Sequence, residues 1–105
     1  MGYGFGGGFG GANMQQLMRQ AQKMQEDMTR IREEIDATEY TSSVGGGMVE
    51  VTLYGNKTVK SVKIKPEVVD PEDVEMLEDL VASAIGDALA KIADDERNKL
   101  PHIGM

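Results

Sequence analysis

The residues best placed to do chemistry in this chain are basic. Arg19 and Lys23 are four positions apart and Arg30 follows seven positions later, so an α-helix would place all three on one face. Such a stripe can contact the phosphates of a nucleic acid. Glu26 and Glu33 lie between and beside these residues, and Glu26 can pair with Arg30 one helical turn away. From the residues alone, a solvated face with salt bridges is the favoured interpretation, and a phosphate-contacting stripe is the alternative.

Residues that support catalysis are scarce. The chain has no Cys, and its single histidine, His102, is in the C-terminal tail without a second histidine or a nucleophile to assist. No serine has a nucleophile-elbow pattern, and no carboxylates have EF-hand or two-metal spacing. Gly2, Gly4 and Gly7 match G-x-G-x-x-G, but no strand precedes them. The sequence predicts a non-enzyme with no cofactor, metal or small-molecule substrate.

The net charge of the whole chain argues against binding to nucleic acid. The 105 residues have a net charge of -7, which disfavours simple electrostatic binding to DNA or to an anionic membrane. The acid is concentrated, however: residues 66–105 hold eleven acidic and three basic residues, whereas residues 13–65 are about neutral. No apolar run approaches a membrane span, no signal peptide is evident, and the absence of cysteine fits a reducing compartment. We therefore expect a soluble cytoplasmic protein with no membrane partner.

A long helix must position the basic residues. Apolar or small residues recur from residue 14 to residue 38 in alternating steps of three and four, an a/d heptad seam. A helix of this length is roughly 37 Å long, too long to be covered by so small a body, so it must project or meet a partner chain. Methionines crowd its first half and isoleucines its second, so we expect the second half to pack and the first to project. The predicted dimer or packing seam consists of Met14, Leu17, Met24, Met28, Ile31 and Ile35.

Residues 39–64 read as a three-stranded β-meander. Strands are predicted at 40–44, 48–54 and 58–65, with a turn at the triple glycine 45–47 and a hairpin around residues 54–57. Val62 and Ile64 are expected to point inward, and Val59, which is out of phase, indicates a bulge or a late start of the strand. The lysines at 57, 60, 63 and 65 either form a basic sheet edge or protect that edge from aggregation.

A second helix follows Pro66. Asp70 is the expected N-cap with Pro71 at the first helical position, and an apolar face between residues 77 and 92 indicates a core helix. Gly86 in its middle suggests close packing or a kink. Asn13 is the expected N-cap of the first helix. The predicted organisation is a disordered glycine-rich tail at 1–12, one α+β domain at 13–98, and a flexible tail at 99–105.

The ordered part resembles the YbaB/EbfC family of bacterial nucleoid-associated proteins. The resemblance rests on residues 14–25 (MQQLMRQAQKMQ), on the triple glycine with the valines that follow it, on residues 62–66 (VKIKP), and on residues 73–81 (DVEMLEDLV). The chain departs from the family pattern at two positions. Gly86 replaces the usual Asn, and Lys65 replaces the usual Asp before Pro66. Both changes concern structure and leave the functional expectation unchanged.

The resemblance implies an α-β-β-β-α protomer, a tweezers-shaped homodimer with projecting helices, and binding to double-stranded DNA in the nucleoid with low sequence preference. It also implies a role in nucleoid organisation and gene regulation. No motif fixes the contacts, so the DNA-binding set is an electrostatic inference; it consists of Arg19, Lys23, Arg30, Arg97 and Lys99. The alternative is a protein–protein adaptor that uses Met-rich projecting helices to clasp an apolar helix.

Overall fold

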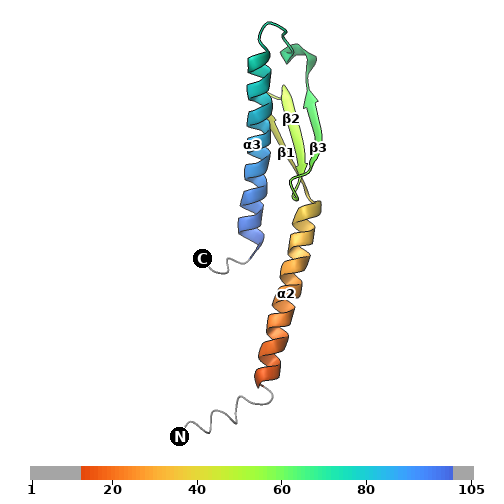
Figure 1. Ribbon diagram of the computed structural model, residues 1–105, viewed down its shortest axis with the longest axis vertical. Helices are drawn as coiled ribbons and strands as arrows, with labels where there is room; N and C mark the ends of the chain where they lie inside the picture. Colours follow the sequence, from red (N-terminus) through yellow and green to blue (C-terminus); the bar gives the residue numbers. More distant parts are fainter. Residues whose placement is uncertain (1–12, 101–105) are drawn as a thin grey trace.

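The computed structural model describes residues 13–100. Helix α2 (Met14–Ala37) leads into strands β1 (Glu39–Val44), β2 (Val49–Tyr54) and β3 (Val59–Ile64), a short 3-10 turn η2 (Pro66–Val68), and helix α3 (Val74–Lys99). This order confirms the predicted α-β-β-β-α fold (Figure 1). The glycine-rich segment 1–12 and residues 101–105, where the sequence predicts tails, lie outside the described residues. Neither helix within the described part carries an apolar stretch long enough to cross a membrane.

The strands form an antiparallel meander in the order β1-β2-β3. Gly45, Gly46 and Gly47 all have positive φ angles, so the turn between β1 and β2 needs three residues without a Cβ atom. The register between β2 and β3 shifts by one residue where Leu53 pairs with Val59. This shift confirms the bulge that the phase of Val59 predicts.

The core lies between α3 and the first two strands. Ala84, Ala88 and Ile92 of α3 are fully buried, as are Val49 and Val51 of β2. The small alanines let the helix approach the sheet so closely that the Ser42 hydroxyl on β1 donates a hydrogen bond to the Ala84 carbonyl. Helix α3 therefore covers one face of β1 and β2.

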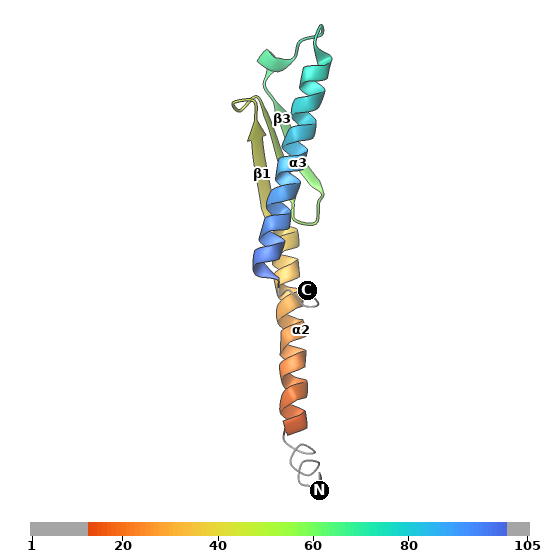
Figure 2. The same cartoon turned by 90° about the vertical axis from the view of Figure 1, so that its left-hand side faces the viewer.

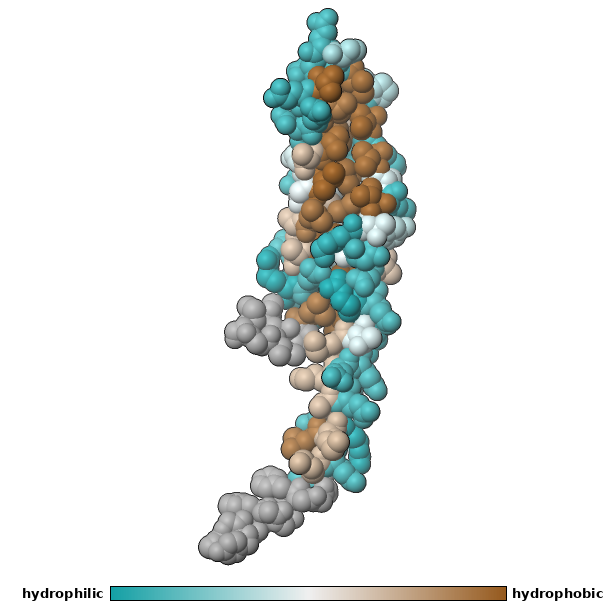
Figure 3. Space-filling view, in the orientation of Figure 1, coloured by the Kyte–Doolittle hydropathy of each residue, from teal (hydrophilic) through white to brown (hydrophobic). Residues whose placement is uncertain are grey.

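Strand β3 differs from the prediction. Val62 and Ile64 pair with Val51 and Val49, so they share the face on which α3 packs. They are nevertheless 43% and 39% exposed, because α3 makes its sheet contacts with β1 and β2. The prediction that Val62 and Ile64 point inward is confirmed by this register, but α3 leaves them largely uncovered. The space-filling view shows an apolar band along the upper body (Figure 3).

Two expectations about α3 also need correction. Its N-cap is Asp73, whose carboxylate accepts a hydrogen bond from the Met76 amide at 3.2 Å. Asp70 instead accepts from the Glu72 amide at 2.9 Å and closes a turn that contains Pro71, which favours the second position of such turns. Gly86 is exposed, and a Cβ atom there would meet nothing within 4 Å. Close packing at Gly86 is therefore wrong.

Most of helix α2 projects away from the body. Only its C-terminal end lies beside α3, and the remainder extends alone (Figures 1 and 2). Asn13 stands at the N-cap position, but its backbone is helical and its side chain makes no capping hydrogen bond to the helix. The part of α2 that precedes Ile31 is called the arm below.

Candidate nucleic-acid interface

Burial along the heptad seam falls between the body and the arm and is then level to the end of the arm. Ile35 is fully buried in the core, and Ile31 packs against its edge. Met24, Leu17 and Met14 are 54%, 57% and 54% exposed. The second half of α2 therefore packs and the first half projects, as the change from methionine to isoleucine predicts.

The joint between arm and body is formed by a close backbone approach. Gly55, in the β2–β3 turn, donates its amide hydrogen to the Thr38 carbonyl at 2.9 Å. A Cβ atom on Gly55 would lie 1.8 Å from the Ile35 carbonyl oxygen, so only glycine fits here. The end of α2 is therefore held against the turn by main-chain contact.

An ionic cluster reinforces the joint. The Arg32 guanidinium donates to Glu96 of α3 at 2.8 Å and to Asp36 at 2.9 Å, and Lys57 of the β2–β3 turn lies 3.5 Å from Glu96. The hydrogen bond from Arg32 lowers the pKa of Glu96, and the same bond raises the pKa of Arg32. Sequence reasoning missed this cluster because Arg32 and Glu96 are far apart in the chain, and no local pattern links them.

A second polar contact lies beside this cluster. The Tyr40 hydroxyl of β1 donates to Asp95 of α3. Burial, followed by this hydrogen bond, raises the pKa of Tyr40 to about 12. The pKa of Asp95 is lowered by the Tyr40 hydroxyl and then by Lys99. The lower end of α3 is thereby fixed to both β1 and α2.

The basic face of the arm divides into two parts. Arg19 and Lys23 are exposed and form no salt bridge with any residue between 13 and 100. Arg30 lies nearer the body and pairs with Asp27 at 3.1 Å and with Glu34 at 3.8 Å. Exposed pairs of this kind contribute at most about 1 kcal/mol, so Arg30 can exchange its partners at little cost. Arg19 and Lys23 are the two cations already available to a phosphate.

The remaining predicted DNA-binding residues, Arg97 and Lys99, lie at the end of α3. Arg97 pairs with Asp94, and Lys99 pairs with Asp95 at 3.1 Å. Arg19 precedes Arg32 by thirteen residues, which places it roughly 20 Å from the joint. The structure therefore brings Arg97 and Lys99 to the joint and leaves Arg19 and Lys23 on the arm.

The sheet lysines form a separate group. Lys60 pairs with Glu39 at 2.8 Å across the sheet, a hydrogen bond that raises the pKa of Lys60. Lys57 belongs to the ionic cluster at the joint. Lys63 and Lys65 are exposed and form no salt bridge within the described chain. They are a second pair of available cations, at the far end of the body from the arm.

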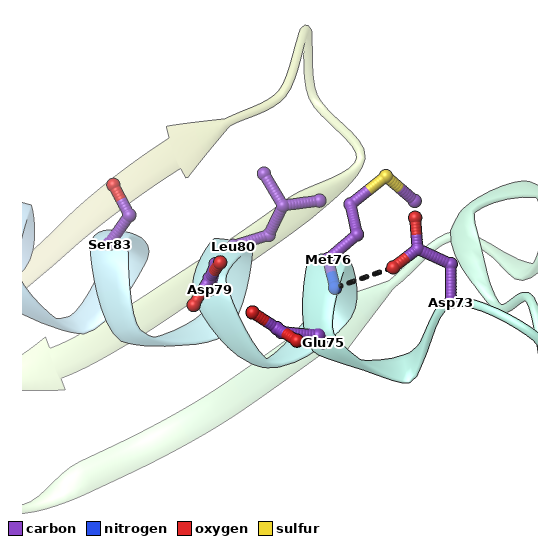
Figure 4. A pocket seen from close by; sticks show the side chains of 6 residues that line it. All are labelled: Asp73, Glu75, Met76, Asp79, Leu80 and Ser83. Carbon is purple, nitrogen blue, oxygen red and sulfur yellow. Dashed lines mark hydrogen bonds between the residues drawn. The ribbon is translucent and has the colours of Figure 1, made fainter.

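A shallow hollow at the start of α3 is acidic and lacks catalytic groups. Figure 4 shows its lining at the start of α3, where Asp73, Glu75 and Asp79 surround Met76 and Leu80, with Ser83 at one end. Asp73 is occupied in capping the helix, and Ser83 has no histidine or lysine in the lining to activate it. This hollow would repel a phosphate. The described residues also contain no cluster of three metal-binding side chains.

Known proteins resemble this chain along most of its length. A family model described as the YbaB/EbfC DNA-binding family matches residues 10–104. The chain belongs to this family. Membership confirms the resemblance seen in the sequence, and it confirms the prediction of a non-enzyme, because the family is one of DNA-binding proteins.

Individual relatives of the YbaB/EbfC family support the assignment. A protein named nucleoid-associated protein from Clostridium botulinum (strain Eklund 17B) is 55% identical over 97 residues, covering 92% of this chain and 86% of the relative. One of the same name from Ruminiclostridium cellulolyticum is 50% identical over 98 residues, covering 90% and 84%. The crystal structure of an uncharacterized protein from Helicobacter pylori superposes with a TM-score of 0.67 at 26% identity, covering 80% of this chain and 88% of the other.

Proposed function

We propose that this protein is a nucleoid-associated homodimer that grips duplex DNA through the exposed basic face of its arms, with low sequence specificity. The observation that carries the proposal is the state of Arg19 and Lys23, which project from the body without an acidic partner in the described chain. The names of the Clostridium and Ruminiclostridium relatives place those proteins at the nucleoid. A cytoplasmic protein of this kind would organise the bacterial chromosome and thereby influence gene expression.

Local charge explains how an acidic protein can bind DNA. Residues 13–25 contain Arg19 and Lys23 and no acidic residue, and the positive end of the helix dipole lies at the same end of the arm. The eleven acidic residues of the last third lie between the sheet and the end of the chain. A phosphate near the arm therefore meets a positive field, because the Debye length at physiological salt is only about 8 Å.

Low specificity follows from the type of side chain available. Arg19 and Lys23 carry charge suited to phosphates, and the neighbouring arm residues are mainly glutamines, whose amides can also bond to phosphate and sugar oxygens. Phosphate contacts position a protein on DNA without reading its sequence. Two arms in a dimer would double the number of these contacts.

The dimer itself is supported by the apolar band on the body. Ile85, Leu89 and Glu96 follow one line of α3, and Glu96 reaches Lys57 at the start of the β3 hairpin, so this flank faces β3. Together with Val62 and Ile64 it forms the body patch, an apolar surface open to solvent. A contiguous exposed apolar surface on so small a domain marks a protein–protein interface.

The experiment is a mobility-shift titration of generic duplex DNA at two salt concentrations. With four phosphate contacts per dimer, affinity should fall about 100-fold between 50 and 200 mM salt, since each contact contributes a slope of about 0.9. Arg19→Ala/Lys23→Ala should lose most of the affinity and most of the salt dependence, and adding Arg30→Ala tests whether Arg30 joins them. Arg97→Ala/Lys99→Ala tests the end of α3 in the same way.

The matched control is Lys63→Ala/Lys65→Ala, which removes two available cations from the body instead of the arm. Equal losses in this control and in Arg19→Ala/Lys23→Ala would mean that total charge matters and that the arm is not the contact surface. An affinity independent of salt would contradict the phosphate mechanism.

The second candidate function is a protein–protein adaptor, and the exposure of Met14, Leu17 and Met24 favours it. An adaptor would bind its partner independently of salt and lose binding when these residues become lysine, while Arg19→Ala/Lys23→Ala would have little effect. No mobility shift at low salt would favour the adaptor.

A further inference from the structure

The apolar side of the arm continues the protein core, and no other element between residues 13 and 100 covers it. The seam starts at the fully buried Ile35 and runs through Met28, Met24 and Ala21 to Leu17. Helix α3 ends beside the joint, so from Met24 toward the N-terminus the seam has no neighbouring element within the described part of the chain. Figure 3 shows apolar surface on the lower arm as well as on the body.

We propose that this seam pairs with the same seam of a second arm, in antiparallel orientation, so that two dimers are joined arm to arm. The occupant is a second copy because the spacing of three and four residues is that of a two-stranded coiled coil. This spacing also continues without interruption from the core along the whole arm.

The antiparallel orientation of the two arms follows from the residues that already pack against the seam where it enters the body. Ile31 and Ile35 pack in the chain's own core, and α3 reaches across to Arg32 through Glu96. A parallel partner in register would bring its own α3 to the same place. An antiparallel partner needs only residues 14–28, of which residues 14–26 are exposed.

Antiparallel pairing also gives matched layers. Opposing an a position with a d position places Leu17 against Met28 of the second arm and Ala21 against Met24 of the second arm. Beside the seam, Met18 then faces Gln25 across the interface, and Gln20 faces Asp27. No like charges meet, so the flanking residues do not oppose the pairing.

The basic face remains free in this arrangement. Arg19 and Lys23 lie on the side of the helix roughly opposite the seam, because successive residues are 100° apart. Each dimer could hold its own duplex while its arms join another dimer, so arm pairing would bridge two DNA segments. The bridging step rests on the proposed function, whereas the pairing itself does not. Four short layers make a weak, reversible contact that bivalency strengthens.

Disulfide trapping tests the pairing and its orientation without DNA. The chain contains no cysteine, so Ala21→Cys and Met24→Cys each introduce a single thiol. The two variants are mixed, with one of them isotope-labelled so that mass spectrometry distinguishes the three disulfide-linked products. The disulfide between Ala21→Cys and Met24→Cys should form in several-fold excess over either homodisulfide. Gln22→Cys, off the seam, provides the background rate.

Dominant homodisulfides would indicate parallel arms and overturn the proposed orientation. Crosslinking at the background rate would overturn arm pairing and leave the seam to a different protein, as in the adaptor function. Each result is obtained whether or not the protein binds DNA.

A second measurement tests bridging. Leu17→Gln/Met24→Gln keeps the charge of the arm and changes only exposed positions, so the body should remain folded. This variant should still shift a single duplex in the mobility assay. In a bridging assay, the protein joins soluble DNA to DNA fixed on beads, and the amount of soluble DNA captured should fall at least tenfold. Thr29→Ala, at an exposed position of the arm off the seam, should bridge like the wild type. Full bridging by Leu17→Gln/Met24→Gln would overturn the role of the arm in bridging.

Discussion

At the scale of single residues, the joint depends on a position where no side chain fits. Gly55 lies so close to the Ile35 carbonyl that any Cβ atom would overlap it. Gly86, by contrast, faces open space in the middle of α3. The same residue type therefore has opposite consequences at the two positions.

Gly55→Ala should destabilise the protein by about 3 kcal/mol or more, because the overlap involves backbone that cannot rotate away. Gly86→Ala should stabilise it by about 0.5–1 kcal/mol, because alanine restricts the unfolded helix segment. Chemical denaturation of the two variants measures both values. A neutral Gly55→Ala would show that α2 and the turn are not held together as described.

Tyr40→Phe should lower the free energy of unfolding by about 1 kcal/mol near neutral pH, since it removes the hydrogen bond to Asp95. The folded pKa of Tyr40 is raised from 10.0 to about 12. Its protonated form therefore stabilises the fold fully below pH 10, and this contribution is lost as the pH rises through about 12. The stability difference between wild type and variant, followed by denaturation at increasing pH, should shrink over that interval. A difference that stays constant to high pH would assign the loss to packing alone.

At the scale of elements, the direction of α2 is set by few contacts. The helix meets the body through Ile35, through the Gly55 turn and through the pair between Arg32 and Glu96. Such a joint has low local stability compared with the core. The ionic cluster should therefore affect the order of the joint more than global stability.

Arg32→Met should change the unfolding free energy by less than about 1 kcal/mol, because the pair with Glu96 is partly exposed. It should nevertheless speed hydrogen exchange of the amides at Asp36, Ala37 and Thr38, which NMR can follow. The pKa of Glu96 is lowered from 4.5, so the pair persists above that pH and is lost as the pH falls through the folded value. Below the folded pKa of Glu96, the amides of the wild type and of Arg32→Met should exchange their hydrogens at the same rate. Arg30→Met, which removes pairs on the arm, should leave the joint unchanged.

At the scale of the whole molecule, two apolar surfaces have different proposed roles. The body patch is broad and lies beside the core, and it is the proposed dimer interface. The arm seam is narrow and projecting, and it supports contact between dimers. Because they are separate surfaces, they can be disrupted independently.

Val62→Lys/Leu89→Lys should convert a dimer into a species of 11.4 kDa in sedimentation analysis at concentrations too low for arm pairing. Both side chains are exposed in the single chain, so the fold should survive. Val69→Lys, which changes an exposed valine in the connection before α3, should leave the dimer intact. A dimer that persists in Val62→Lys/Leu89→Lys would place the interface elsewhere.

Patterns repeated along the chain were enough to predict most of the fold. The seam of α2, the strand alternation with its bulge at Val59, and the apolar face of α3 each arise from local periodicity, which a sequence displays directly. The change from methionine to isoleucine along α2 even predicts which half projects. The cap of α3 was misplaced because Asp70 and Asp73 both suit that position, and only the turn around Pro71 distinguishes them.

Which charges are available, and which apolar residues are covered, was decided by the tertiary structure. The sequence by itself determined that Arg19, Lys23 and Arg30 share a face and that the chain has an apolar stripe longer than its body. Only the fold shows that Arg32 and Lys57 meet Glu96 of α3, and that Val62 and Ile64 lie beyond the reach of α3. The physical reason is that helix and strand periods are local properties of the chain. Ion pairing and burial, by contrast, depend on contacts such as that between Arg32 and Glu96, which form only when distant segments meet.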